Sequence, residues 1–291
     1  MTQAGALVLV RDPLTGFLTD TTLGVVATHY EYSDFGELES MTASISGLPV
    51  YETSFTRDNL GRITTKAETI EGVTSIHVYG YDPAGRLDTV TIDGVLAADY
   101  DHDDNGNRLL KTTPGGSEVG AYDDQDRMTS YGDASFTYTR NGEPLTKTDS
   151  AGTTTFDYDV FGNLLGVDLP SGLAVDYVVD ARNRRIGKKI DGVPVQGFLW
   201  QGQLSPIAEL GGAGDLVSRF VYATRVNVPD FMIRGGSTYR ILTDYLGSPR
   251  LVVDATTGAI AQQVDYDEWG VVLQDTNPGW MPFGFAGGLS D

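Results

Sequence analysis

A short motif recurs along the whole chain, and this repetition constrains the fold more than any other feature of the sequence. The motif is Tyr-Asp-x-x-Gly or a close variant of it. The nine copies are YSDFGEL (32–38), RDNLGRI (57–63), YDPAGRL (81–87), HDDNGNR (102–108), YDDQDRM (122–128), YTRNGEP (138–144), YDVFGNL (158–164), VDARNRR (179–185) and YDEWGVV (266–272). A repeat this short predicts one small supersecondary unit that stacks many times.

Each copy has the chemistry of a type I β-turn. The second position is Asp in seven of the nine copies, and the fifth is Gly in seven. A type I turn favours Asp at its first corner, accepts Pro at the second and favours Gly where φ becomes positive, as in Asp82-Pro83-Ala84-Gly85. The predicted structural turn residues are Asp58, Gly61, Asp82, Gly85, Asp103, Gly106, Asp123, Asp159, Gly162, Asp180, Asp267 and Gly270.

A second kind of turn lies near the middle of most intervals between copies. Asp93-Gly94 and Asp191-Gly192 are examples, and Asp-Gly is a strong signal for a two-residue hairpin. Each unit therefore holds two strands and two turns. The fold class that follows is all-β, with repeated antiparallel β-hairpins. No window of helical period is long enough and free enough of Gly to predict a helix.

Aromatic residues occur in pairs two positions apart within the predicted strands, so each pair points to one face of its strand. Successive pairs are expected to form an aromatic ladder along one face of the sheet, with polar residues on the other. The pairs are Tyr30 and Tyr32, Tyr79 and Tyr81, Phe136 and Tyr138, and Phe156 and Tyr158.

One copy also has the opening spacing of an EF-hand calcium loop, at Asp101, Asp103, Asn105 and Gly106. Such a loop needs a bidentate carboxylate at its twelfth position, and that position is Thr112. The alternative is a structural turn. Because this stretch is in register with the eight other turns, the structural interpretation is favoured.

Composition excludes several classes of function. The formal net charge of −20 argues against binding to nucleic acid, which depends on Lys and Arg that neutralise phosphates. There is no Cys and no apolar stretch near the roughly 20 residues of a membrane span. The first residues lack the features of a signal peptide.

No catalytic motif is present. The pair Asp265 and Asp267 could do acid–base work, but it lies beside a repeat turn, and its structural interpretation is favoured. We predict no catalytic residue, no cofactor and no metal site.

The chain divides into three parts of one continuous unit. Residues 1–27 are expected to be a lead-in of one or more strands, residues 28–195 a YD-repeat sheet, and residues 196–291 a C-terminal part without the tight period. In this last part, residues 227–236 are expected to form a loop, and the end is expected to pack as irregular structure.

The repeats and two later elements resemble the RHS (YD-repeat) family, which includes bacterial polymorphic toxins, the C components of insecticidal toxin complexes and the YD shell of animal teneurins. The first element, TDYLGSPRLVVD (243–254), is similar to the family's D-H-L-G-S-x-R element, with Tyr245 where His is usual. The second, NPGWMPFGFAGGL (277–289), is similar to the stretch near the end of an RHS core. The resemblance covers the chain from about Arg11 onwards.

The resemblance implies a sheet that spirals into part or all of a hollow β-shell. In bacterial members the shell encloses a toxic C-terminal polypeptide, which some members release by aspartyl autoproteolysis. The cleavage element, with its repeated Asp-Pro-Gly, is not within the 291 residues, so that segment and the toxin are expected beyond them.

Three functions are compatible with these observations. The first is a non-enzymatic shell segment that contains a toxin cargo, of basic charge if the acidic residues line the interior, with an N-terminal delivery domain or a secretion apparatus as further partner. The second is a cell-surface or carbohydrate-binding module, and the third is the core of an autoprotease. We expect a secreted or cell-surface location as part of a larger protein, and self-association through open sheet edges.

Overall fold

The computed structural model describes residues 2–4 and 6–290. Within them, 27 strands form one sheet, and each strand pairs antiparallel with its neighbours in the chain. The strands are β1 (Thr2–Ala4), β2 (Leu7–Arg11), β3 (Leu18–Leu23), β4 (Val26–Tyr32), β5 (Leu38–Ile45), β6 (Leu48–Arg57), β7 (Ile63–Ile70), β8 (Val73–Tyr81), β9 (Leu87–Ile92), β10 (Val95–His102), β11 (Arg108–Thr113), β12 (Gly116–Tyr122), β13 (Met128–Tyr131), β14 (Ala134–Tyr138), β15 (Pro144–Asp149), β16 (Gly152–Tyr158), β17 (Leu164–Asp168), β18 (Ala174–Val179), β19 (Arg185–Ile190), β20 (Val193–Trp200), β21 (Pro206–Gly211), β22 (Leu216–Val221), β23 (Phe231–Arg234), β24 (Ser237–Thr243), β25 (Pro249–Asp254), β26 (Ile260–Tyr266) and β27 (Val272–Asp275). The predicted all-β fold of repeated antiparallel hairpins is confirmed.

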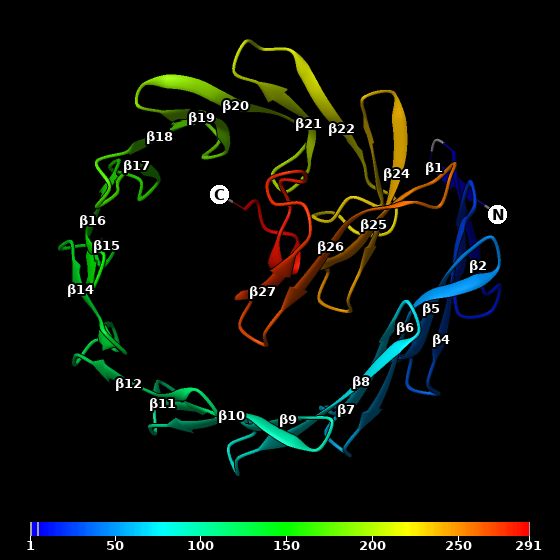
Figure 1. The fold of residues 1–291 in the computed structure, drawn as a ribbon, viewed down its shortest axis with the longest axis horizontal. Coiled ribbons are helices and arrows are strands. Elements are labelled where there is room, and N and C mark those ends of the chain that lie inside the picture. The colour runs from blue at the N-terminus through cyan, green and yellow to red at the C-terminus, as the bar shows by residue number, and fades with distance from the viewer. Residues whose placement is uncertain (1, 5, 291) are drawn as a thin grey trace.

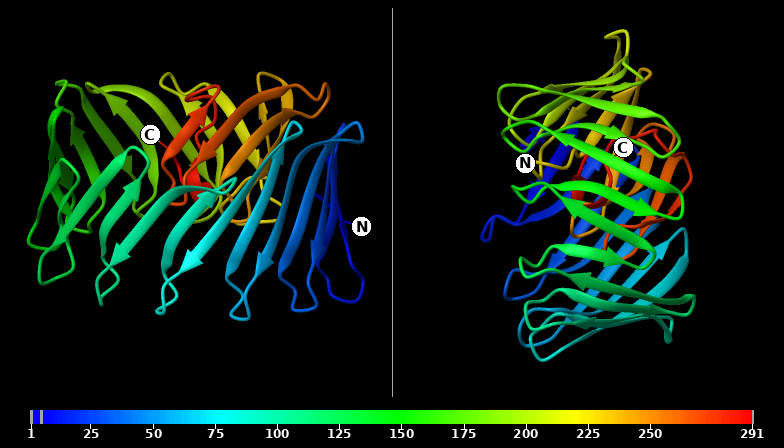
Figure 2. Two further views of the ribbon diagram at one scale, coloured as in Figure 1. Left: turned by 60° about the horizontal axis from the view of Figure 1, so that its bottom comes forward. Right: turned by 90° about the vertical axis from the view of Figure 1, so that its left-hand side faces the viewer.

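The sheet curves into an open spiral (Figure 1). The strands up to β22 run round a ring, and β24 to β27 continue inside it, beside the first strands. The wall is one strand tall, and both of its rims consist of turns (Figure 2). The C-terminal end of the chain lies inside the ring.

The repeat turns share one rim because of the antiparallel meander. Each of them joins an even-numbered strand to the next odd-numbered one, so all must lie at the same end of the strands. Gly85 takes a φ of 86°, the region where glycine is favoured. In the two copies without Gly, Asp126 and Asn183 each take a φ of 58°, which these residue types tolerate better than most.

The main core lies where the two ends of the spiral overlap. Val26, Met41 and Tyr51 on the inner face of β4 to β6 pack against Leu242 and Leu251 of β24 and β25. Leu7, Leu9 and Leu23 pack against Phe231 and Ala255 in the same way. The first strands and the last strands thus form two layers there.

The C-terminal segment covers the opposite face of the inner layer. Met281 and Phe283 pack against Phe220, Met232 and Val252. This is why Val252 and its neighbours in β25 are buried on both faces, whereas the strands between β11 and β21 form a single layer.

One expectation from the sequence needs correction. The segment 227–236 is not wholly a loop, because Phe231–Arg234 forms β23 between β22 and β24. Its four residues were too short a run between Pro229 and Gly235 to be recognised as a strand. The C-terminal segment is mostly irregular, as expected, and holds one turn of 3₁₀ helix, η1 (Phe285–Gly287). The described residues contain no helix with the length and apolarity needed to cross a membrane.

Candidate functional site

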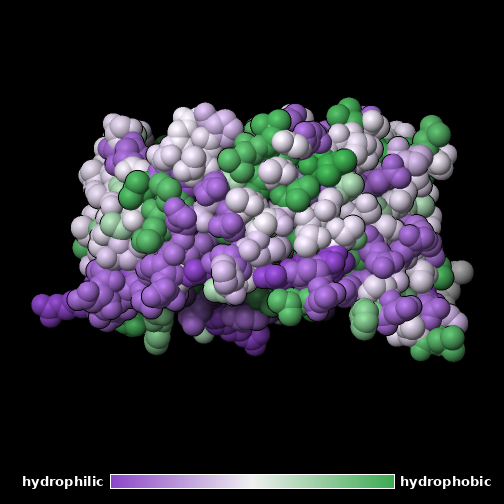
Figure 3. All heavy atoms as spheres, turned by 90° about the horizontal axis from the view of Figure 1, so that it is seen from below, coloured by the Kyte–Doolittle hydropathy of each residue, from purple (hydrophilic) through white to green (hydrophobic). Residues whose placement is uncertain are grey.

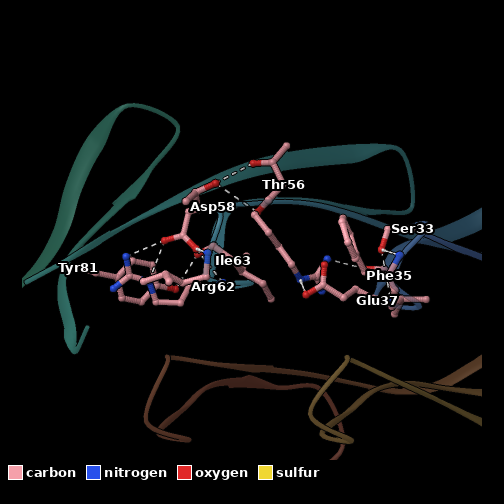
Figure 4. Close-up of polar contacts among 12 residues, drawn as sticks. Ser33, Phe35, Glu37, Thr56, Asp58, Arg62, Ile63 and Tyr81 are labelled. Carbon is pink, nitrogen blue, oxygen red and sulfur yellow. Dashed lines mark hydrogen bonds and ion pairs between the residues drawn. The ribbon is translucent and has the colours of Figure 1, made fainter. Parts of the chain in front are cut away.

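In the seven copies with Asp at the second motif position, that Asp organises its turn through its carboxylate, as Asp58 shows (Figure 4). Oδ1 of Asp58 accepts hydrogen bonds from the backbone N–H groups of Leu60 and Arg62, at 2.9 and 3.1 Å, and its Oδ2 accepts one from Arg62 Nε at 2.8 Å. Because these bonds favour the ionised form, the pKa of Asp58 lies below its usual value. The same Asp–Arg pair, four residues apart, occurs at Asp82 and Arg86, Asp123 and Arg127, and Asp180 and Arg184.

The carboxylate of Asp103 is engaged in the same way, with Asn107 in place of Arg. Its Oδ1 accepts the backbone N–H groups of Asn105 and Asn107, and its Oδ2 accepts Asn107 Nδ2 at 2.9 Å. Gly106 closes the turn with a hydrogen bond from its N–H to the Asp103 carbonyl at 3.1 Å. These oxygens therefore bind the turn itself, in the geometry of the other repeats. Asp159 and Asn163 repeat this arrangement.

In four copies the Tyr of the motif joins its unit to the preceding one through its hydroxyl group. Tyr81 donates its hydroxyl to the carbonyl of Ile63, the first strand residue after the previous turn, at 2.6 Å (Figure 4). Arg62 of that turn lies over the Tyr81 ring at 4.5 Å, a cation–π distance. Tyr138 makes the same bond to the Met128 carbonyl at 2.6 Å. Asp, Arg and Tyr thus form a repeated connection along one rim.

The predicted aromatic pairs all lie on the inner face of the wall. Tyr79 pairs in register with buried Val90, and Tyr30 with buried Met41. Phe136 and Phe156 occupy the corresponding positions in the middle strands. The pairs of the middle strands are half-buried because no second layer covers them.

Charges of both signs accompany these aromatics on the inner face. The cations at inward positions of β7 to β21 are Lys66, Arg108, Lys111, Lys147, Arg185 and Lys188. The carboxylates at such positions are Glu68, Glu118, Asp149 and Glu209. The acidic excess of the chain is therefore not on these strands of the inner wall, so the condition that would favour a basic cargo, an acidic interior, is not met there.

A buried ion cluster joins the two layers of the spiral. Arg250, from the TDYLGSPR element, lies 2.9 Å from Glu68 of β7 and 2.7 Å from Asp265 of β26. The Tyr51 hydroxyl donates to Glu68 at 3.1 Å, and Lys66 lies 3.5 Å from it. Both Arg250 and Glu68 are about 95% buried, with 5% of each side chain exposed. We call this cluster the seam.

The hairpin of β26 and β27 makes a second connection across the interior. Its repeat turn places Asp267 3.3 Å from Lys111 and the Trp269 ring 5.6 Å from the Tyr100 ring. The guanidinium of Arg108 lies 4.5 Å from Trp269. This hairpin therefore binds the inner face of the wall far from its own position in the chain.

The chemistry of these groups is that of structural contacts. Asp265 and Asp267 are two residues apart but pair with different cations, on different strands. Burial and the nearby Lys66 lower the pKa of His77 to about 4, so its ring is neutral at pH 7. Burial raises the pKa of Asp244, whose Oδ1 accepts the N–H groups of Gly247 and Ser248, both at 2.8 Å.

Sequence reasoning missed the importance of Arg250 and Glu68. They are 182 residues apart in the chain, and neither belongs to a repeat turn. The available signal was the Asp244-to-Arg250 element itself, since Asp244 to Gly247 is a turn with the same backbone hydrogen bonds as the repeats.

Comparison with known proteins agrees with this architecture. The family model described as Teneurin YD-shell matches residues 1–291. Teneurin-4 of Mus musculus is 27% identical over 277 residues, and teneurin-1 of Gallus gallus is 25% identical over 300 residues. These alignments cover 91% and 99% of this chain but 10% and 11% of the teneurins. The chain thus spans about a tenth of the length of these relatives.

A solved structure also has this fold. A chain of the Photorhabdus luminescens Tc holotoxin pore superposes with a TM-score of 0.52 and 13% identity, over 98% of this chain and 19% of that one. The likeness shows a shared spiral sheet and no more. The repeats, the spiral and the match along the whole chain have one explanation, which is that the chain belongs to the teneurin YD-shell family of RHS (YD-repeat) proteins.

Proposed function

We propose that this chain is a segment of the wall of an RHS-type shell that encloses a polypeptide, and that it acts as a scaffold without catalysing a reaction. The observation that supports this most directly is the placement of the C-terminal end inside the ring (Figure 1). A polypeptide joined there starts within the space that the wall surrounds.

The height of the wall fits a segment of a larger shell better than it fits a complete shell. Strands of 6 to 8 residues, such as β9 and β10, span roughly 20–27 Å at about 3.3 Å per residue. The ring is open at both rims (Figure 2). Full enclosure therefore needs further turns of sheet or other domains.

The partners follow from this role. We propose a C-terminal toxin polypeptide as cargo and an N-terminal delivery domain or secretion apparatus as further partner, in a secreted or cell-surface protein. The mixed charge of the inner wall gives no reason to prefer a basic cargo. Self-association through the open edge at β27 is a further proposed contact.

Protease protection tests containment. A short flexible peptide with one protease site is added after Asp291 in one variant and before Met1 in another. We expect at least tenfold slower cleavage of the C-terminal peptide, because the wall limits access to it. A variant that weakens the seam, Arg250→Met, should reduce this protection. Equal cleavage rates at the two ends would refute the proposal.

The alternatives receive less support. A surface-binding module needs rows of exposed aromatics, but the predicted pairs face inward. Seen from below, the outer face of the wall shows separate hydrophobic patches among hydrophilic residues (Figure 3). Ile76 and Val78 of β8 and Val119 of β12 are among the exposed hydrophobic side chains of the wall. For autoproteolysis, we expect an intact band when this chain is incubated alone, because Asp265 and Asp267 are both held in ion pairs.

A further inference from the structure

A cavity lies between the two layers of the spiral. Its volume is about 470 Å³, within the range of small-molecule sites, about 300–1,000 Å³. One wall is the inner face of β2 to β6, and the other is formed by residues 224–230 and 240–245, from the loop after β22 and from β24. The cavity therefore exists only because the ends of the chain overlap.

Four arginines line this cavity, in a chain whose net charge is −20. They are Arg11, Arg57, Arg225 and Arg240, and the carboxylates in the lining are Asp230 and Asp244. Four positive charges and two negative ones give a formal charge of +2 for the lining. This local excess is opposite in sign to the protein as a whole.

Two of the arginines are not neutralised within the described part of the chain. Arg11 donates to the Gly16 carbonyl and Arg225 to the Tyr245 carbonyl, both at 3.1 Å, and neither lies within 4.0 Å of a carboxylate there. Each guanidinium has five N–H donors, so most remain available to a ligand. By contrast, Arg240 is paired with Asp230 at 3.5 Å, and both are buried.

Both free arginines lie near one tyrosine of the repeat. Burial raises the pKa of Tyr32, and the positive charges of Arg11 and Arg225 oppose that rise. The Phe17 ring lies 4.9 Å from the Tyr32 ring, and Tyr30 follows on the same face. Flat aromatic surfaces therefore lie beside planar cationic groups, a combination that accommodates a ring with an acidic substituent.

We propose that this cavity binds a carboxylate-bearing sugar unit, such as a uronate or sialate residue of a glycan. Arg11 and Arg225 pair with the carboxylate, since guanidinium groups match its bidentate geometry. The aromatic wall of Phe17, Tyr30 and Tyr32 accommodates the apolar face of the ring. A volume of about 470 Å³ is far larger than an inorganic anion requires, which favours an organic ligand. This binding is independent of containment.

Titration calorimetry on the full chain tests this proposal. The probes are glucuronate, N-acetylneuraminate, neutral glucose, inorganic phosphate and a short polyglutamate peptide. We expect saturable one-to-one binding of at least one acidic sugar, which weakens as salt is raised, and no binding of glucose. Arg11→Gln and Arg225→Gln should each weaken the acidic sugar at least tenfold.

A matched control removes the same charge elsewhere. Arg140→Gln, at an exposed repeat turn, should leave the affinity unchanged, and circular dichroism should show that all three variants remain folded. Absence of acidic-sugar binding overturns the proposal. So does phosphate or polyglutamate that binds as tightly as the sugar, or a sugar affinity that Arg11→Gln and Arg225→Gln leave unchanged.

Discussion

Replacing Arg250 with Met removes the cation at the centre of the seam and leaves Glu68 buried. Removing one partner of a buried pair typically costs about 3–5 kcal/mol, because the other charge loses its compensation. Glu68 keeps Lys66 at 3.5 Å and the Tyr51 hydroxyl at 3.1 Å, and Asp265 is 41% exposed. We therefore expect a loss near the lower limit, about 3 kcal/mol, which is large beside the roughly 5–15 kcal/mol of a typical domain.

A double mutant distinguishes the destabilising effect of the uncompensated Glu68 charge from that of the lost packing of Arg250. Adding Glu68→Gln to Arg250→Met removes the uncompensated charge, so part of the loss should be recovered. Urea unfolding followed by tryptophan fluorescence measures this, since Trp269 and Trp280 lie in the elements that the overlap holds. Arg219→Met, at an exposed position, is the control and should cost under about 0.5 kcal/mol.

Two results would refute this reasoning. The first is a cost for Arg250→Met no larger than that of Arg219→Met, which would mean that the seam contributes nothing to stability. The second is a double mutant whose loss equals the sum of the two single losses. Glu68 and Arg250 would then act independently, despite the 2.9 Å between them.

Three further predictions test other parts of the wall. Because the pKa of His77 is lowered to about 4, its contribution to stability is present above about pH 6.5, the unfolded value, and is lost as pH falls toward 4. His77→Gln should make the urea midpoint of unfolding depend less steeply on pH over that range. An unchanged dependence on pH would contradict this. Tyr81→Phe removes the bond to the Ile63 carbonyl and should cost about 1 kcal/mol in urea unfolding, and a cost near zero would count against the connection between repeats. Leu273, 61% exposed on β27, is at the open edge, so Leu273→Lys should lower self-association in sedimentation velocity. An unchanged sedimentation profile would show that copies do not pair through this edge.

The sequence predicted the local structure well because turn chemistry acts within five residues. Asp82 and Gly85 are sufficient to specify a type I turn, and the bond from Arg86 to Asp82 spans only four residues. The pairing of aromatics on one face was also predictable, because a strand alternates with a period of two. β23 was missed because Phe231–Arg234 has no period long enough to detect.

The sequence could not predict which face is concave. Tyr79 and Tyr81 share a face in any strand, but whether that face points inward depends on the curvature of the whole sheet. Curvature also brings Arg250 to Glu68, and Arg225 to the cavity beside Tyr32. Such contacts involve residues with no local signal, so the seam and the cavity both lay beyond sequence reasoning.

Packing in a hydrophobic core and pairing between neighbouring repeats stabilise different parts of the wall. None of the four hydrophobic clusters in the described residues includes a residue from β11 to β21, so these strands depend on backbone pairing and on the connections between repeats. In such an array each unit is stabilised mainly by its neighbours, and the wall can be extended without a new core. The overlap, by contrast, holds the buried ion cluster and most of the core. We infer that the overlap sets the closure of the spiral, and that the single-layer strands supply most of its inner surface, which is the surface that the proposed cargo would meet.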